Sequence, residues 1–408
     1  MDVKINLERL KNNLMELSKI GKDPSGGISR PSFSKADLEA REWLKDKISC
    51  AGLCASQDGA GNIFGTLEGK GKTVMTGSHI DTVINGGMFD GTVGVLSALE
   101  CLQRIKEEKI NHTKPLSMVS FTDEEGNLAG DFLGSRAFTG LIEREILEKG
   151  KTQFGPPLKT ILENTEFSID SIMKASEQRP QIEAFIEIHI EQGPLLETED
   201  KFIGVVENIA GKNLWTCLFQ GQAGHAGTTP FELRHDAFLG LADFALKGTQ
   251  YVAKEHYGSM LTIGNAHIHP GSFSIIPDRV EFSLDFRSQS SQTLKEIEKR
   301  VLGFAKDISL SRGLYFDYKV IDKTEPVKTS ARLKELMIKF CKELDYSYMT
   351  LNSGAGHDAQ ILNSVSDTGM IFIPCEDGIS HSPQEGIKWE DLEKAANVLL
   401  RVLLALSA

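Results

Sequence analysis

The chain has 408 residues, of which 40% are hydrophobic and 25% are charged, and its formal net charge is −12. This composition is typical of a globular protein rather than a disordered one, and the length favours two domains over a single core. The negative charge argues against a nucleic-acid or anionic-membrane surface, although a few local cations could still hold an anionic substrate.

The first 17 residues are charged and helical in pattern, without the apolar core of a signal peptide. No stretch of the chain approaches the roughly 18 apolar residues of a membrane helix. The six cysteines lie at positions 50, 54, 101, 217, 341 and 375, and they include no C-x-x-C pair. The sequence therefore predicts a cytoplasmic protein whose thiols are reduced and mostly buried.

Helix and strand patterns alternate through the first half of the chain. Apolar residues recur at helical spacing over about 35–54, behind Ser34 as an N-cap. Short apolar runs at 73–76 and 116–122 predict buried strands, with a helix at 91–104 between them. This alternation is typical of an α/β domain whose helices cover a largely parallel sheet. In such sheets, functional groups collect just beyond the carboxyl ends of the strands.

The pattern changes in the second half. The strand at 182–190 alternates so that His189 lies on the face opposite its isoleucines. At 280–287, apolar and polar residues alternate, which predicts an antiparallel sheet with one solvated face and helices on the other. We therefore expect two domains: a mainly parallel-sheet catalytic domain at 1–208 and 326–408, and an inserted smaller α+β domain at 209–325.

Histidines and acids follow several of these strands. His79 and Asp81 lie in GSHIDTV, where a carboxylate two residues from an imidazole can orient a metal-binding ring. Asp90 lies in the glycine-rich turn NGGMFDGTVG, at the start of a helix. Taken singly, each has an ordinary alternative, namely a core or surface histidine and an aspartate N-cap.

Three adjacent acids in FTDEEG strengthen the case. Asp123, Glu124 and Glu125 repel one another, and cations explain all three better than helix capping does. His189 in EIHIEQG and His381 in GISHSPQE add two imidazoles at a strand end and in a polar loop. Two acids and three histidines of this kind suit a pair of divalent ions such as zinc, manganese, nickel or cobalt.

Several motifs together resemble a known family, the M20-type metallo-amidohydrolases: GSHIDTV, GGMFDG, FTDEEG, FLGSRAFTG, EIHIEQG, AGHAGTTP and SGAGHDA. The most similar branch is that of N-carbamoyl-L-amino-acid hydrolase, allantoate amidohydrolase and β-ureidopropionase. The resemblance runs in one order from GGISRPSFS to GISHSPQE and covers most of the chain. It implies a binuclear metal hydrolase whose smaller domain serves as lid and dimer contact.

The resemblance also implies roles for individual residues. The metal ligands would be His79, Asp90, Glu125, His189 and His381. Asp90 would bridge the two ions, with His79 and His189 on one ion and Glu125 and His381 on the other. Glu124 matches the family's general base, and Asp81 would orient His79.

The remaining implied roles concern the substrate. His225, in GQAGHAGTTP, would reach from the smaller domain into the partner's site and steady the substrate carbonyl or developing oxyanion. Arg287 would hold the substrate carboxylate. Ser274 stands where this branch commonly has an asparagine that helps the arginine, so the chain departs from the pattern there. The same pocket would be lined by Gln192, Gly356 and His357.

Three functions remain open on these grounds. The first is hydrolysis of an N-carbamoyl group from an amino acid or an allantoate-like ureide, with release of ammonia and carbon dioxide. The second is a dipeptidase or N-acyl-amino-acid amidase on the same scaffold. The third is a non-catalytic binding protein, which a missing ligand or base would favour, but all five ligand positions and Glu124 are filled. The expected partners are a small ureido or amide substrate and a second copy of the chain, with neither nucleic acid nor membrane.

Overall fold

The computed structural model describes residues 3–150, 152 and 156–408. The chain divides into two compact units: unit 1 is formed by Met1–Glu207 with Thr329–Ala408, and unit 2 by Asn208–Lys328. The residue pattern predicts the inserted domain at 209–325. Among the helices of the described ranges, none is both long and apolar enough to cross a membrane.

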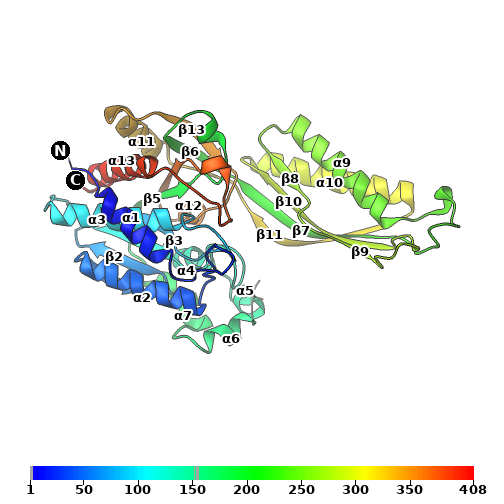
Figure 1. Ribbon diagram of the computed structural model, residues 1–408, viewed down its shortest axis with the longest axis horizontal. Helices are drawn as coiled ribbons and strands as arrows, with labels where there is room; N and C mark the ends of the chain where they lie inside the picture. Colours follow the sequence, from blue (N-terminus) through cyan, green and yellow to red (C-terminus); the bar gives the residue numbers. More distant parts are fainter. Residues whose placement is uncertain (1–2, 151, 153–155) are drawn as a thin grey trace. The chain divides into compact units, whose positions relative to one another are not determined.

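The larger sheet has nine strands among the described residues, in the order β1-β2-β4-β3-β5-β14-β6-β12, with β13 beside β6 (Figure 1). Its central strands β4, β3, β5 and β14 run parallel, whereas the pairs toward both edges are antiparallel. The fold of unit 1 is therefore mixed α/β, parallel at its centre as expected. The strands are β1 (Cys54–Gln57), β2 (Ile63–Leu67), β3 (Thr73–His79), β4 (Leu116–Phe121), β5 (Ile182–Ile190), β6 (Ile203–Ile209), β12 (Val327–Lys328), β13 (Tyr348–Ser353) and β14 (Asp367–Ile373).

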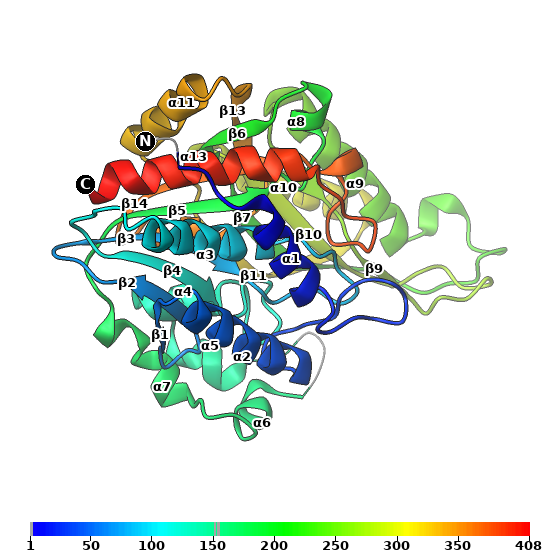
Figure 2. The same cartoon turned by 60° about the vertical axis from the view of Figure 1, so that its left-hand side comes forward.

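Helices cover this sheet, and two clusters of buried apolar side chains join the helices among the described residues. Five of them share one buried cluster with the central strands, and Figure 2 shows α1, α3 and α13 lying over the sheet: α1 (Leu7–Leu17), α2 (Lys35–Cys50), α3 (Thr92–Glu107), α11 (Ala331–Glu343) and α13 (Trp389–Ser407). A second cluster joins four short helices and the 3₁₀ turn η1: α4 (Leu133–Thr139), α5 (Arg144–Lys149), α6 (Leu158–Leu162), α7 (Ile169–Met173) and η1 (Ala175–Gln178). The remaining short elements of unit 1 are α8 (Leu195–Thr198), α12 (Asp358–Leu362) and η3 (Glu376–Gly378).

Several expected boundaries differ from the observed ones, and for two of them the local structure gives the reason. The helix expected at 35–54 ends at Cys50, because Gly52 adopts a left-handed conformation (φ +71°) that ends the helical path. The strand expected at 73–76 continues to His79, because its last residues stay in register with β4. This extension places His79 at the end of the strand. At Gly77 a side chain would collide with the Val119 carbonyl of β4, so this close approach requires glycine.

Unit 2 contains a five-stranded antiparallel sheet in the order β11-β7-β10-β8, with β9 beside β10. Side chains of α9 and α10 share one buried cluster with those of β7 and β10, and the alternating polar residues of β10 are half-buried. The apolar face of β10 is therefore more deeply buried than its polar face. The elements are β7 (Gly211–Gln220), η2 (Phe231–Leu233), α9 (Ala237–Glu255), β8 (Met260–Thr262), β9 (Ala266–His269), β10 (Arg279–Ser288), α10 (Ser291–Arg312) and β11 (Tyr315–Thr324).

Candidate metal centre

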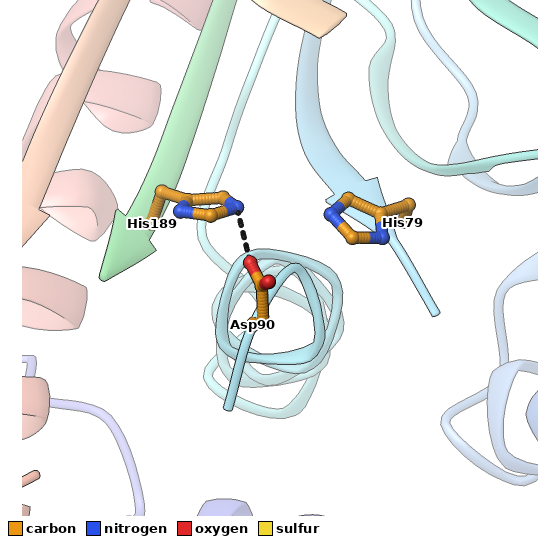
Figure 3. Close-up of side chains that lie close together, drawn as sticks. All are labelled: His79, Asp90 and His189. Carbon is orange, nitrogen blue, oxygen red and sulfur yellow. Dashed lines mark ion pairs between the residues drawn. The ribbon is translucent and has the colours of Figure 1, made fainter. Parts of the chain in front are cut away.

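Four neighbouring parallel strands deliver side chains to one edge of the larger sheet. His79 is the last residue of β3, and His189 is the next-to-last residue of β5. Glu124 and Glu125 follow β4, and His381 lies in the loop after β14. Because carboxyl ends of parallel strands meet at the same edge, segments far apart in the sequence converge there (Figure 3).

Asp90 joins this edge from the turn before α3. The next residue, Gly91, has a left-handed conformation (φ +64°), and a side chain there would collide with the His79 ring. The glycine of the FDG motif is therefore needed for both its backbone conformation and the close approach of His79. The adjacent helix N-terminus also favours a carboxylate at this position.

Two groups of candidate ligands share Asp90. The first is His79, Asp90 and His189, the second is Asp90, Glu125 and His381, and within each group the ligand atoms lie within 4.8 Å of one another. His189 Nε2 is 3.1 Å from Asp90 Oδ1, and His381 Nε2 is 3.0 Å from Asp90 Oδ2. Asp90 thus presents one oxygen to each group, as a bridging carboxylate would.

A third buried group consists of Glu187, His189 and His357. The Glu187 carboxylate already accepts hydrogen bonds from Ser78 Oγ (2.7 Å) and from the Ala359 amide (2.9 Å). Both of its oxygens are therefore engaged by the protein, so this group supports the His189 ring rather than forming a separate centre.

Buried polar atoms that lack a hydrogen bond indicate what the two Asp90 groups can hold. Among the described residues, His79 Nε2 and Glu125 Oε1 are buried and have no hydrogen-bond partner. Leaving such atoms unpaired costs about 1–3 kcal/mol each, so their presence calls for an explanation. Imidazole nitrogens and carboxylate oxygens suit zinc, manganese, nickel and cobalt, and the residues present therefore fit divalent ions.

The electrostatics of the centre support the same conclusion. Burial, and then the neighbouring carboxylates, raise the pKa values of Glu124 and Glu125 well above their usual range. Although burial opposes it, hydrogen bonding to His189 and His381 holds the pKa of Asp90 well below its usual range. Burial lowers the pKa of His189, but the hydrogen bond to Asp90 and the nearby negative charges together outweigh burial and raise this pKa to about 9. The centre therefore holds more buried acid than its histidines neutralise, and divalent cations would offset the excess.

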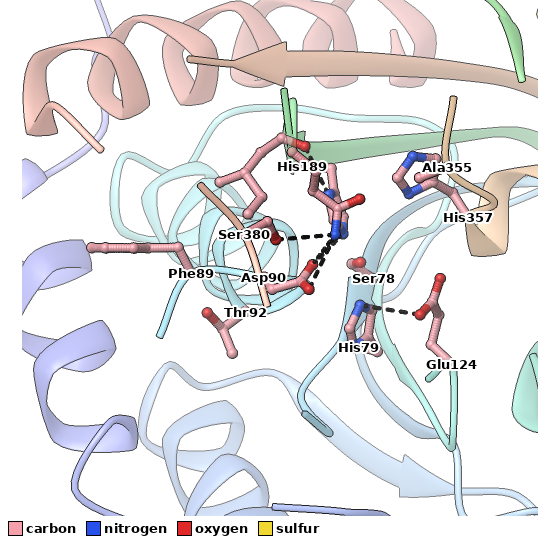
Figure 4. A network of polar contacts seen from close by, with 12 residues as sticks. Ser78, His79, Phe89, Asp90, Thr92, Glu124, His189, Ala355, His357 and Ser380 are labelled. Atoms are coloured by element: carbon pink, nitrogen blue, oxygen red, sulfur yellow. Dashed lines mark hydrogen bonds and ion pairs between the residues drawn. The ribbon is translucent and has the colours of Figure 1, made fainter. Parts of the chain in front are cut away.

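The three adjacent acids after β4 have different surroundings. Asp123 has a left-handed conformation (φ +57°), and its carboxylate accepts from the amides of Asn127 and Leu128, both at 2.9 Å. It therefore shapes the turn. Glu124 instead reaches His79, with Oε2 3.6 Å from Nε2 (Figure 4), while Glu125 lies 3.6 Å from His381 Nε2.

Asp81 contacts both His79 and the turn after β4 that carries Glu124 and Glu125, here called the acidic turn. His79 Nδ1 lies 3.1 Å from the Asp81 main-chain carbonyl and 3.6 Å from its carboxylate. That carboxylate also accepts from the amides of Glu124 (3.4 Å) and Glu125 (3.3 Å). The sequence pattern shows only the first contact, because the second joins segments more than 40 residues apart.

Gln192 and His357 lie beside the ligand groups. Gln192, with φ +57°, donates through Nε2 to both oxygens of Asp90 at 3.2 Å. The His357 ring is buried edge-on against His189 (4.6 Å between centroids), and Ser353 Oγ is 2.9 Å from its Nε2. Gly356 packs so closely on Phe132 that a side chain would have to displace it.

Glu385 is a further residue at this site, and no sequence motif points to it. It is buried, and it accepts hydrogen bonds from the amides of Phe89 (2.8 Å) and Asp90 (3.1 Å). Burial and the Asp90 charge raise the pKa of Glu385 to about 7. It belongs to the same GISHSPQE motif as His381, but an acid in a polar loop carries no sign of a partner almost 300 residues away.

His225 and Ser274 lie together in unit 2. His225 forms an isolated bridge with Ile275, and the next amide, that of Ala226, donates to the Ser274 carbonyl at 2.8 Å. Both side chains are exposed. The Gly227 amide donates to His225 Nδ1 at 3.1 Å, so a neutral His225 carries its proton on Nε2 and can act there as a donor.

Arg287 lies near the opposite end of β10. The His225 and Ser274 loops adjoin the start of the strand, where Arg279 lies opposite Gln220 of β7. Arg287 lies opposite Lys212, at the other end of the same strand pair. The two arginines are eight positions apart on the extended strand, which corresponds to about 27 Å at about 3.4 Å per residue. Within one chain, Ser274 therefore lies near His225 and far from Arg287. The family pattern instead suggests that the residue at this position acts beside the arginine.

Arg287 also has a partner in its own strand. Its Nη2 is 2.8 Å from Asp285 Oδ2, and its Nε is 3.1 Å from both Asp285 oxygens. Asp285 lies two residues earlier on the same half-buried face. Asp285 fixes the plane of the guanidinium, and an incoming carboxylate would share the guanidinium with Asp285.

Known proteins resemble this chain over its whole length. The family model described as peptidase family M20/M25/M40 matches residues 75–405. The N-carbamoyl-L-amino acid amidohydrolase of Geobacillus stearothermophilus is 35% identical over 404 residues, covering 98% of both chains. The allantoate amidohydrolase of Bacillus subtilis is 32% identical, again over 98% of both chains. A crystal structure of a hydantoinase/carbamoylase family amidase from Burkholderia multivorans superposes with a TM-score of 0.90 at 33% identity, covering 100% of this chain and 99% of the other.

Proposed function

The chain belongs to peptidase family M20/M25/M40, and we propose that it is a binuclear metal-dependent amidohydrolase acting on an N-carbamoyl-L-amino acid or a related ureido acid. It would cleave a non-peptide C–N bond and release ammonia and carbon dioxide, as an N-carbamoyl group breaks down. The single observation that carries the proposal is the pair of ligand groups sharing Asp90, with Glu124 beside them. The full-length relatives named for ureido substrates support the substrate class.

Two divalent ions would be held by five residues, with Asp90 common to both: His79 and His189 on one side, Glu125 and His381 on the other. When bound, they would supply Lewis acidity that polarises a carbonyl and makes water acidic enough to react near neutral pH. Asp81 would fix the His79 ring and the acidic turn in one arrangement. Zinc, manganese, nickel and cobalt all suit these ligands.

Glu124 would move the proton. Its Oε2 reaches the ligand groups without belonging to either. It would take a proton from the attacking water and deliver it to the leaving nitrogen, which converts a poor leaving group into a neutral amine or ammonia. General acid–base catalysis of this kind contributes about 10²–10⁴-fold to rate.

Unit 2 would supply the substrate contacts. His225 Nε2–H would donate to the substrate carbonyl oxygen, and Arg287 would hold the carboxylate. Because about 27 Å separates these regions of β10, one chain's unit 2 cannot place both on one small substrate. We therefore propose that the enzyme is a homodimer in which His225 and Ser274 come from the partner.

Exposed apolar side chains in unit 2 support such a contact. Several large ones are solvent-exposed among the described residues: Phe231, Leu233, Leu246, Phe273 and Tyr315. Burial of such side chains against a partner surface would be favourable. Lid and dimerisation are therefore the roles proposed for unit 2.

The competing functions differ in what is released. A dipeptidase or N-acyl-amino-acid amidase would use the same centre and release an amine without ammonia. A binding protein would take up ligand without turnover, although the filled ligand positions and Glu124 argue against it.

The decisive experiment follows these products. Protein reconstituted with manganese or zinc is assayed for ammonia release from N-carbamoyl-L-amino acids and allantoate, and for amine release from dipeptides and N-acetyl amino acids. We expect ammonia from a ureido substrate. Amine release alone would move the enzyme to the second function, and binding without turnover would move it to the third.

A further inference from the structure

The two halves of the proposed metal centre are unequally supported. His79, Asp90 and His189 are buried, and both histidines lie in strands of the central sheet. The His381 side chain is half exposed, and the residue has a left-handed conformation (φ +54°) in the loop after β14. A ligand on a loop depends on other contacts to stay in place.

Glu385 provides a contact of this kind. It lies four residues after His381, and its Oε1 accepts from the amides of Phe89 and Asp90. Its Oε2 accepts a hydrogen bond at 3.2 Å from the Oγ of Ser380, the residue immediately before His381. One carboxylate therefore joins the His381 loop to the Asp90 turn.

Gln192 closes this connection into a ring. Its Nε2 donates to both Asp90 oxygens, is 3.3 Å from Ser380 Oγ and is 3.3 Å from His381 Nε2. In Figure 4, dashed lines from Ser380 and from Asp90 meet near the same nitrogen atom. The ring of contacts runs from Asp90 through Gln192, Ser380 and Glu385 back to the Asp90 amide.

The chain leaves room for this carboxylate. A side chain at Gly87 would collide with Glu385, so the second glycine of the NGG turn makes space for it. The loop also closes on itself, since the Glu385 amide donates to the Ser382 carbonyl and the Glu376 amide to the Gly386 carbonyl. Because the Glu385 oxygens are engaged by amides and a hydroxyl, the residue positions ligands and does not itself bind a metal.

We propose that Glu385 is a positioning residue that holds the His381 loop against the Asp90 turn and so sets the affinity of the second, more exposed metal site. The inference rests on the proposed binuclear function. Removing the Glu385 carboxylate would free the loop to move away from Asp90. The second ion would then lose a preorganised ligand, while the first would keep His79, Asp90 and His189.

The test measures metal binding directly. Metal content after dialysis and stepwise calorimetric titration with Mn²⁺ or Zn²⁺ are compared for wild type, Glu385→Ala and Glu385→Gln. We expect wild type to bind two ions per chain. Glu385→Ala should bind the first ion with affinity within about threefold of wild type and the second at least about tenfold more weakly. Glu385→Gln keeps an oxygen for the two amides and should recover the second affinity to within about threefold.

Matched variants separate this role from general destabilisation. Glu100 is a buried carboxylate on α3 that accepts from the Asn6 amide and pairs with Arg9, so Glu100→Ala should lower stability without changing either metal affinity. Ser380→Ala removes one link of the ring and should weaken the second ion by about threefold. It also decides the matter if Glu385→Ala does not fold.

The outcomes distinguish the two proposals. Unchanged affinity for the second ion in Glu385→Ala and Ser380→Ala would overturn the positioning role while leaving the binuclear function intact. A similar loss in Glu100→Ala would also overturn it, by showing that any destabilisation weakens the second site. A wild-type chain that binds fewer than two ions would remove the binuclear proposal itself, and this inference with it.

Discussion

The proposed ligands of unit 1 and the proposed substrate contacts of unit 2 differ in how firmly the chain holds them. His79, Asp90 and His189 are at most 5% exposed and have partners from several strands and turns. His225 and Ser274 are exposed, on two loops that are joined to each other by a bridge between His225 and Ile275. Unit 1 thus preorganises its candidate metal ligands by itself, whereas substrate contacts on a surface need another surface to complete them.

Removal of metal from the proposed centre of unit 1 should reduce activity more than any other change. Treatment with a chelator should abolish turnover, and added Mn²⁺ or Zn²⁺ should restore it. Loss of ions present at about 100 times their dissociation constant removes about 2.7 kcal/mol of stabilisation per site, so the melting temperature should also fall. Activity assays and thermal melts with and without metal check both effects. Full activity after the metal content falls to zero would contradict the proposed centre.

Glu124→Gln should have the next largest effect. It keeps the shape of the side chain but removes the proton acceptor, so kcat should fall by about 10²–10⁴-fold. Both metal affinities should stay close to wild type, because Glu124 belongs to neither ligand group. Steady-state kinetics and metal titration on one preparation measure the two quantities. If turnover persists, Glu124 is not the base.

His225→Ala should lower kcat by about 10²–10³-fold, the usual loss when a donor to a developing oxyanion is removed. Metal content should be unchanged. A random mixture of His225→Ala and Glu124→Gln chains then tests the dimer. If His225 acts across the interface, half of the dimers are mixed and each has one intact site, so about a quarter of wild-type activity returns. If it acts within its own chain, mixing returns none.

Ser274→Asn should have the smallest effect. The longer amide adds a donor beside His225, so the KM for the preferred ureido substrate should fall by up to about tenfold, the worth of about one hydrogen bond. The kcat should change by less than about twofold. KM values for allantoate and several N-carbamoyl amino acids, with Ser274→Ala as control, show which substrate gains. Equal changes with asparagine and alanine would place Ser274 outside the substrate site.

Local patterns predict much of the fold because they act over a few residues. The alternation at 280–287 predicts one buried face of β10, and the α9 and α10 side chains indeed pack there. Boundaries are less certain, as α2 shows by ending at Cys50 instead of position 54. There, a single left-handed glycine outweighs the helical spacing of the apolar residues.

The site is predictable only in part for a similar reason. The strand-end positions of His79 and His189 follow from apolar runs and residue types, and the family resemblance assigns them to one ion. The second contact of Asp81, the turn-forming role of Asp123 and the contacts of Glu385 do not follow. Each depends on a hydrogen bond whose partner the residue's own neighbourhood does not reveal.

Residue patterns alone predict the α/β class, an inserted second domain and a set of residues able to hold metal, because periodicity and side-chain chemistry are local properties. Two relations become visible only in the folded chain: Asp90 faces two ligand groups at once, and Glu385 joins the Asp90 turn to the His381 loop. The folded chain also places Ser274 near His225, about 27 Å along β10 from Arg287. Such relations arise when strands far apart in the sequence become neighbours in a sheet, and that pairing follows from packing of the whole core rather than from any one segment.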